Sequence, residues 1–189
     1  MRALLREIEY LSVLFSRRVW GFERGACARL GCVTSRLVPR ILRHYGASVG
    51  DDVRVASPLV VHNAERTFAN LTLKDGTYIG RDCLIDLKQK IEIGARVTLA
   101  MRVTIITHMD VGRSSWSERG YPASSAPVTI GDDAYIGAGA IILPGVRIGA
   151  GALVGAASLV RHDVPAGARV AGVPARELGP GTGAELGNS

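Results

Sequence analysis

The sequence is poor in residues that form cross-links, span membranes or hold metals. Its three cysteines, Cys27, Cys32 and Cys83, are an odd number without metal-ligand or redox spacing, so we expect reduced thiols in a cytoplasmic protein. No apolar run approaches the length of a transmembrane helix, and charged residues interrupt the first apolar stretch, so no signal peptide is expected. The histidines and carboxylates show no spacing typical of a metal cluster, and we expect no metal.

What the sequence has instead is a six-residue repeat between Ile130 and Pro165. Its units begin at Ile130, Ile136, Ile142, Ile148, Val154 and Val160. The first residue of each unit is aliphatic and β-branched, the fifth is small or β-branched, and the second is most often Gly. Neither the alternation of a strand nor the period of about 3.6 residues of a helix fits, so the repeat indicates short strands joined by tight turns, a β-helix. We expect the first residue to face the core, the second-position Gly to supply unusual backbone angles, and three units to complete a coil.

Weaker copies of the same register extend the repeat toward the N-terminus. They begin at Leu73, Ile79 and Ile85, at Ile93, Leu99 and Ile105 after a slip, and at Val49, Val55 and Val61. The solenoid is therefore predicted to run from about residue 49 to 165 as roughly five coils. The spacing from Ile105 to Ile130 is not a multiple of six, and the Gly, Ser and Pro residues of 109–127 predict an excursion loop there.

Charge divides the chain into two regions. Lys and Arg total 23 and Asp and Glu total 17, but residues 1–46 hold nine Arg against three Glu, so the remainder is neutral. We predict a basic helical N-terminal segment at 1–46, a β-helix domain at 47–178 with its loop at 109–127, and a disordered Gly-rich tail at 179–189. The helical prediction rests on apolar residues at helical spacing: Leu4, Ile8, Leu11, Phe15 and Val19.

Two interpretations of the N-terminal segment are open. The segment can cap the first coil, because the end of a solenoid otherwise exposes unpaired strands and apolar residues. Alternatively, an Arg-rich amphipathic helix with Phe15, Trp20 and Phe22 can lie on an anionic membrane surface, which would make the protein peripheral to the membrane.

One residue departs from the repeat in a way that indicates chemistry. His108 lies in the last unit before the excursion loop, where a solenoid needs only a small turn residue. Histidine titrates near neutral pH, so His108 is a candidate general base, and Asp110 is a carboxylate near enough in sequence to hold its ring in one tautomer. A plain surface-turn histidine is equally compatible with the pattern.

Several motifs together resemble the hexapeptide-repeat acyltransferases. They are the hexads, Thr107-His108-Met-Asp110 before a loop, the return Ala126-Pro-Val-Thr-Ile-Gly-Asp-Asp-Ala-Tyr-Ile-Gly, Ile142-Leu-Pro-Gly-Val, Asp163-Val-Pro-Ala and Val170-Ala-Gly-Val-Pro-Ala-Arg176. The resemblance covers roughly residues 73–178 and is greatest to maltose, galactoside and nodulation O-acetyltransferases and the colanic-acid type. It implies an all-β, left-handed parallel β-helix that assembles as a homotrimer and moves acetyl from acetyl-CoA to a hydroxyl.

The resemblance also assigns roles to individual residues. His108 would deprotonate the acceptor, which attacks the thioester without an acyl-enzyme. Asp86 and Trp116 would contact the acceptor, although Gly80 stands where the sugar acetyltransferases carry an acceptor-binding Asn. The acetyl-CoA site, in a groove between two subunits, would be formed by Tyr135, Ala138, Gly155, Ala156, Arg161, His162 and Arg176. Arg161-His162 replaces the usual Thr-Lys at the phosphate end, which is a departure from the family pattern.

The sequence therefore predicts an acetyl-CoA-dependent O-acetyltransferase acting on a saccharide, with no nucleic-acid partner. Alternatives are an N-acetyltransferase acting on an amino sugar or amine, and a β-helix scaffold without activity. A zinc lyase like the gamma carbonic anhydrases is disfavoured, because His62, His108 and His162 lack the close pair that those enzymes need.

Overall fold

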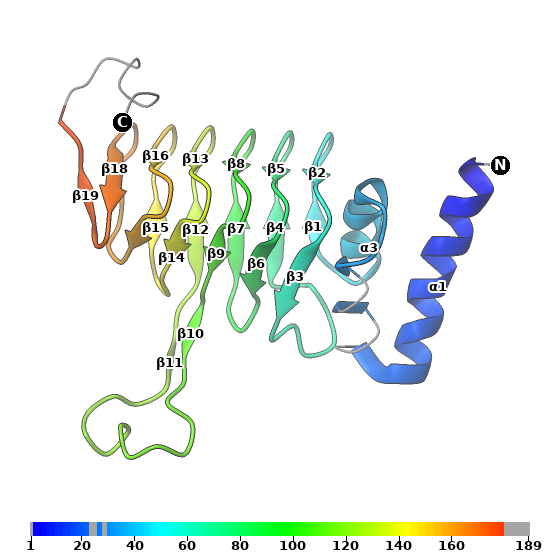
Figure 1. The fold of residues 1–189 in the computed structure, drawn as a ribbon, viewed down its shortest axis with the longest axis horizontal. Coiled ribbons are helices and arrows are strands. Elements are labelled where there is room, and N and C mark those ends of the chain that lie inside the picture. The colour runs from blue at the N-terminus through cyan, green and yellow to red at the C-terminus, as the bar shows by residue number, and fades with distance from the viewer. Residues whose placement is uncertain (1, 23–25, 28–29, 180–189) are drawn as a thin grey trace.

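The chain folds as a three-sided parallel β-helix with helices at its N-terminal end (Figure 1). The structure, a computed structural model, describes residues 2–22, 26–27 and 30–179. Face A consists of β1 (Ser48–Val49), β4 (Leu71–Leu73), β7 (Ile91–Ile93), β12 (Val128–Ile130) and β15 (Arg147–Ile148). Face B consists of β2 (Arg54–Val55), β5 (Tyr78–Ile79), β8 (Thr98–Leu99), β13 (Tyr135–Ile136), β16 (Leu153–Val154), β18 (Arg169–Gly172) and β19 (Ala175–Glu177). Face C consists of β3 (Leu59–His62), β6 (Cys83–Asp86), β9 (Thr104–Ile105), β14 (Ile141–Ile142) and β17 (Leu159–Val160).

The six-residue register predicted from the sequence is the register in which the strands of successive coils pair. Ile130 pairs with Ile148, Ile136 with Val154 and Ile142 with Val160, so three six-residue units complete one coil. The unit-opening residues point inward, and all of them except the partly buried Val49 are buried in one continuous core. The small fifth residues are buried as well, among them Cys83, where burial raises the thiol pKa to about 11. The fold prediction is confirmed, including its count of about five coils.

The second-position glycines serve a different purpose from the one expected. None of Gly131, Gly137 and Gly149 has a positive φ. A Cβ on Gly131 would lie 2.5 Å from the backbone nitrogen of Ala150 in the next coil, so the side chain is excluded by close stacking of the coils. Positive φ angles occur instead at the fourth position, where Gly139 and Gly151 and also Asp133 adopt them. The expectation about backbone angles was therefore wrong, because the constraint comes from the neighbouring coil.

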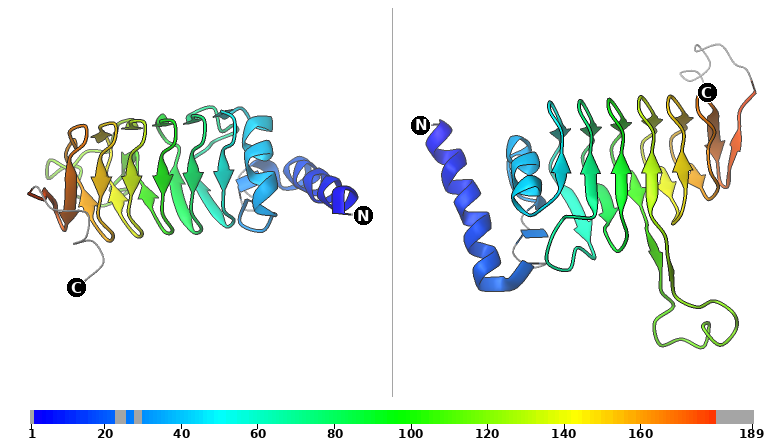
Figure 2. Two further views of the ribbon diagram at one scale, coloured as in Figure 1. Left: turned by 90° about the horizontal axis from the view of Figure 1, so that it is seen from above. Right: turned by 180° about the vertical axis from the view of Figure 1, so that it is seen from behind.

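The N-terminal helices differ in how they meet the solenoid. Helix α3 (Val38–His44), which follows the short 3-10 helix η2 (Ser35–Leu37), buries Val38, Ile41 and Leu42 completely against the first coil. Helix α1 (Arg2–Phe22) lies beyond α3 and stands clear of the solenoid (Figure 2). Its body-facing side buries Tyr10 and Val13, whereas the predicted apolar stripe faces away. Helix α3 therefore caps the first coil as expected, whereas the apolar stripe of α1 does not contribute to the cap. The side chain of Val19, which was also predicted to belong to the stripe, lies outside the described residues.

The excursion loop leaves the solenoid at the corner between faces C and A. Its base is a two-stranded antiparallel ladder of β10 (His108–Met109) and β11 (Ser124–Ser125), and its tip projects away from the coils (Figure 1). At the tip Trp116 packs edge-to-face on Tyr121, and the Arg119 guanidinium lies 5.2 Å from the Trp116 ring centroid. The predicted loop is therefore partly a β-ladder. The predicted tail, apart from Gly179, lies outside the described residues.

Across the described helices, none combines the length and the apolar character needed to cross a membrane.

Candidate active site

His108 is held in place by the junction between the solenoid and the hairpin. It opens β10, directly after Thr107 at the corner where face C ends. Its backbone pairs with Ser125 of β11, and the amide of Ala126 donates to the carbonyl of Thr107 at 2.9 Å. The side chain is 32% exposed, so the ring is anchored on one side and accessible on the other. A histidine anchored on one side and accessible on the other can act on a bound ligand.

The carboxylate that contacts the imidazole is Asp86, the last residue of β6. The distance from His108 Nδ1 to Asp86 Oδ2 is 2.6 Å, and Asp86 is only 3% exposed. Asp110 does not fill this role, because its Oδ1 accepts from the Gly112 amide within the loop. The prediction for Asp110 was therefore wrong. The prediction that Asp86 binds the acceptor is also wrong, because its carboxylate is buried and its oxygens are already hydrogen-bonded.

Asp86 is held by partners on both neighbouring coils. Its Oδ1 accepts from Asn63 Nδ2 at 2.7 Å, and its Oδ2 accepts from the Thr107 amide at 2.8 Å. The Thr107 hydroxyl lies 3.1 Å from Oδ2 and 2.8 Å from the Asp86 carbonyl, and it accepts from the Gln89 amide. Burial alone would raise the pKa of Asp86, but hydrogen bonds from Asn63, His108 and Thr107 outweigh it and lower the pKa to about 2.

The ionised state of Asp86 fixes the chemistry of the histidine. An ionised carboxylate only accepts hydrogen bonds, so Nδ1 of a neutral His108 carries the proton and Nε2 keeps its lone pair. Nε2 makes no hydrogen bond to any part of the chain that the structure describes. A histidine whose tautomer is set by a buried carboxylate in this way is chemically able to accept a proton at Nε2.

Asn63 is the site residue that the sequence analysis missed. It adopts a positive φ of 54° directly after β3, and its amide reaches the next coil. The signal was present in the register: Val61 pairs with Ile85 and His62 with Asp86, so Asn63 lies beside the carboxylate once the coils are stacked. Asparagine tolerates the left-handed conformation better than most residues, which explains its position there.

The residues expected to line the pantetheine arm lie at a different corner. Ala138, Gly155 and Ala156 follow β13 and β16, where face B turns into face C, while His108 lies where face C ends. The two corners are separated by the width of face C, roughly 15–20 Å for a short strand and its turns. Tyr135, 45% exposed, lies on face B, the side opposite the His108 corner. A single chain does not bring these residues to His108.

The residues expected at the phosphate end do come together. Arg161 and His162 follow β17, Arg176 lies on β19, and all three line one pocket at the C-terminal end of the solenoid. Asp163 and Glu177 line the same pocket, so the two Arg charges share it with two carboxylates. Trp116, expected at the acceptor, lies in the exposed cluster at the hairpin tip.

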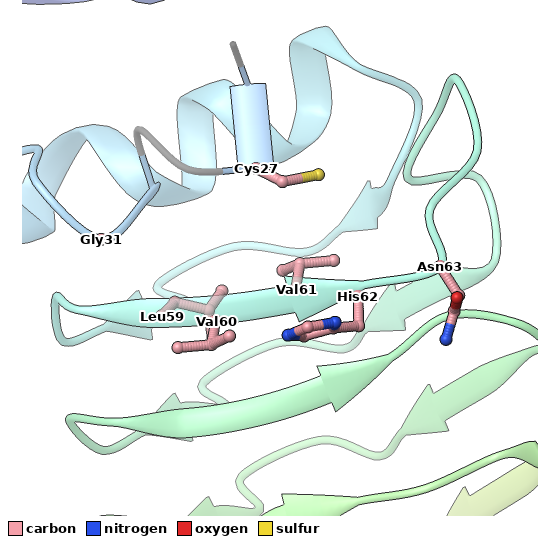
Figure 3. Close-up of a pocket in the computed structure, with 7 residues that line it drawn as sticks. All are labelled: Cys27, Gly31, Leu59, Val60, Val61, His62 and Asn63. Carbon is pink, nitrogen blue, oxygen red and sulfur yellow. The ribbon is translucent and has the colours of Figure 1, made fainter. Parts of the chain in front are cut away.

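A groove that the sequence analysis did not anticipate lies beside β3 (Figure 3). Its walls are Cys27 and Gly31 of the N-terminal segment and the residues from Leu59 to Asn63. Asn63 belongs to both this groove and the Asp86 network, so the groove opens next to the site.

No group of three or more His, Cys, Asp or Glu side chains within residues 2–22, 26–27 and 30–179 is arranged to hold a metal ion. The three histidines considered for a zinc site lie on different parts of the solenoid: His62 on β3, His108 on β10 and His162 after β17.

Comparisons with known proteins found a family model, curated relatives and solved structures that are similar to this chain. The family model described as bacterial transferase hexapeptide (six repeats) matches residues 127–162. A 2,3,4,5-tetrahydropyridine-2,6-dicarboxylate N-acetyltransferase from Staphylococcus aureus strain JH9 is 53% identical over 57 residues, 30% of this chain. The match spans 24% of the length of that relative.

Two solved structures are similar over most of the chain. A maltose O-acetyltransferase from Clostridium difficile 630 has a TM-score of 0.68 and 27% identity, covering 88% of this chain and 86% of that one. A galactoside acetyltransferase in complex with coenzyme A has a TM-score of 0.64 and 21% identity, covering 90% of this chain and 80% of that one. The resemblance to hexapeptide-repeat acyltransferases that the motifs indicated is confirmed, and so is the left-handed β-helix class.

Proposed function

We propose that the protein transfers an acetyl group from acetyl-CoA to a hydroxyl of a saccharide, with His108 as general base. The observation that carries this proposal is the 2.6 Å contact between His108 Nδ1 and the buried Asp86. A solenoid corner needs neither residue, and a buried carboxylate held by two further partners has no evident use except to orient the ring.

The reaction would proceed by direct transfer. Nε2 of His108 takes the proton of the acceptor hydroxyl while the oxygen attacks the thioester carbonyl of acetyl-CoA. The tetrahedral intermediate then collapses, the carbon–sulfur bond breaks, and the imidazolium returns the proton to the departing CoA thiolate. Asp86 stabilises the imidazolium between these steps. A positioned base of this kind accelerates transfer by about 10²- to 10⁴-fold.

Three observations support acetyl-CoA as the donor. The similar proteins named above are acetyltransferases, and one was solved with coenzyme A. Small residues at Ala138 and Gly155 leave the backbone accessible to the amides of a pantetheine arm. Arg161 and Arg176 in one pocket offer forked donors to phosphates beside the carboxylates of Asp163 and Glu177.

A homotrimer would complete the site. Cyclic symmetry brings two different patches of identical chains together, so the corner carrying His108 in one subunit can meet the corner carrying Ala138 in the next. The outward side of face C is suited to such contact, because three of its outward residues are apolar and part-exposed or exposed: Val60, Leu84 and Ile141.

The acceptor would reach His108 from the groove beside β3. That groove adjoins Asn63 and offers the imidazole of His62 as a polar contact among apolar walls (Figure 3). A saccharide hydroxyl is the acceptor we favour, since the two similar solved structures are sugar acetyltransferases by name.

An amine acceptor is the second candidate. The similar protein from Staphylococcus aureus is an N-acetyltransferase by name, and the same base would serve an amine that reaches the site protonated. The β-helix without activity is the remaining alternative, and the intact Asp86–His108 pair argues against it.

The test is release of free CoA thiol from acetyl-CoA in the presence of a panel of sugars and amino sugars. Thiol release that depends on a hydroxyl acceptor and is lost in His108→Ala is the result we expect. Release with amino sugars alone would establish N-transfer. No release with any acceptor, together with no binding of acetyl-CoA, would favour the inactive scaffold.

A further inference from the structure

An apolar stripe on α1 has no partner within the part of the chain that the structure describes. It consists of Leu4, Leu5, Ile8, Leu11 and Phe15, each between 56% and 68% exposed. Leu4, Ile8, Leu11 and Phe15 follow one another at intervals of three and four residues, so they lie along one face of the helix. The helix stands beyond α3 (Figure 2). Its stripe is exposed, whereas Tyr10 and Val13 of the same helix are buried. Contiguous exposed apolar surface of this kind marks an interaction site.

Both carboxylates of α1 are used inside the chain. Glu7 forms a salt bridge with Arg40, whose guanidinium lies 3.8 Å from the centre of the Tyr10 ring. Glu9 accepts from the amide and the hydroxyl of Thr34, each at 2.7 Å. These contacts hold one side of α1 against the residues that follow it in the N-terminal segment. The opposite side of the helix therefore faces solvent.

The remaining charge of this region is positive. Residues 1–46 contain nine Arg and three Glu, and α1 itself contains four Arg. A second copy of this segment would bring the same excess of positive charge, and Glu7 and Glu9 are already paired within the chain. An anionic lipid surface carries the opposite charge and offers an acyl boundary to the apolar stripe. Charge complementarity therefore favours a membrane surface over helix pairing.

We propose that α1 docks the protein on an anionic lipid bilayer, with the stripe from Leu4 to Phe15 lying in the interface. The helix would lie in the plane of the headgroups and would not cross the membrane. The proposal is independent of the acetyl-transfer reaction, because it uses none of the residues assigned to that site.

The test is co-sedimentation of the full chain with vesicles. Vesicles of phosphatidylcholine mixed with phosphatidylglycerol should pellet the protein at low salt, and pure phosphatidylcholine vesicles should not. Ile8→Ser/Phe15→Ser should lower the partition coefficient roughly tenfold or more, because two large apolar side chains no longer enter the interface. The matched control is Met101→Ser/Val173→Ser, which replaces two equally exposed apolar residues of the solenoid, 58% and 72% exposed, and should bind as the native chain does.

Three results would overturn the proposal: no pelleting with anionic vesicles, equal pelleting with neutral ones, or full binding by Ile8→Ser/Phe15→Ser. Light scattering provides the competing readout. If Ile8→Ser/Phe15→Ser has a lower molar mass than the native chain and the native chain does not bind vesicles, the stripe pairs with a second copy and the proposal fails. Far-UV circular dichroism of both double variants checks that the fold is retained, as expected for exposed positions.

Discussion

At the residue scale, the proposed reaction depends on His108 and on the Asp86 carboxylate that contacts it. His108→Ala should lower kcat by about 10²- to 10⁴-fold while the dissociation constant of acetyl-CoA stays nearly unchanged, because a base acts in the transition state and not in donor binding. Steady-state kinetics and calorimetry on the same preparations measure the two quantities. Native turnover in the variant would remove His108 from the mechanism.

Asp86 should also contribute to the pH dependence of stability. Its pKa falls from an ordinary value of 3.8 to about 2 in the folded chain. A lowered pKa stabilises the native state above about pH 4, and this stabilisation is lost as the pH falls through 2. Between pH 5 and pH 3 the native chain should lose about 1 kcal/mol more unfolding free energy than Asp86→Asn. Urea unfolding at both pH values measures the difference. Equal losses of unfolding free energy would show that the partners of Asp86 do not lower its pKa.

Asn63 should act through Asp86. Asn63→Gly keeps the left-handed backbone conformation and removes only the amide, so it isolates the 2.7 Å hydrogen bond. We expect kcat to fall roughly tenfold, since a hydrogen bond to a charged group is worth about 1.5–3 kcal/mol, and the pH profile of kcat to shift. Acetyl-CoA affinity should not change. An unaltered pH profile with reduced stability would make Asn63 a structural residue only.

The sequence analysis singled out His108 as a candidate but paired it with the wrong carboxylate, and the reason is geometric. Asp110 is close to His108 along the chain, whereas Asp86 is 22 residues away and becomes its neighbour only because successive coils stack. The hexad register already aligned Ile85 with Ile105. Extending that register by one residue would have placed Asp86 next to the His108 corner.

At the element scale, the coils were predictable because the parallel strand pairs of the solenoid repeat one register. The hairpin was not, because the pairing of His108 with Ser125 crosses a loop whose Gly, Ser and Pro content shows only that the chain leaves the solenoid. The orientation of α1 relative to the solenoid could not be predicted from the sequence pattern either. Helical spacing defines an apolar face, and only the contacts of Tyr10 and Glu7 determine that this face points outward.

The spacing between coils has a direct test in two glycines. Gly131→Ala should destabilise the fold by roughly 2–3 kcal/mol, because its Cβ would overlap the backbone of Ala150. Gly151→Ala is the control: it has a φ of 65° and open space around it, so it should cost only about 1 kcal/mol of backbone strain. Thermal or urea unfolding measures both. If Gly131→Ala costs no more than Gly151→Ala, close stacking of the coils does not exclude a side chain at the second position.

At the scale of the whole molecule, the proposed reaction requires a site shared between subunits, because His108 and Ala138 lie at different corners of one chain. His108→Ala and Ala138→Trp should each be inactive as pure trimers. Mixed in equal amounts and reassembled, they should recover about a quarter of native activity, since one interface in four pairs an intact His108 with an intact Ala138. Light scattering confirms the trimer in each sample. No recovery from mixed trimers would mean that each chain carries its own complete site.

The most direct test of the central claim is a calorimetric titration of the native chain with acetyl-CoA, since it requires no knowledge of the acceptor. We predict saturable binding near one site per subunit, retained in His108→Ala and weakened in Arg161→Ala/Arg176→Ala. Absence of binding by the native chain would contradict the assignment of acetyl-CoA as donor and, with it, the proposed reaction.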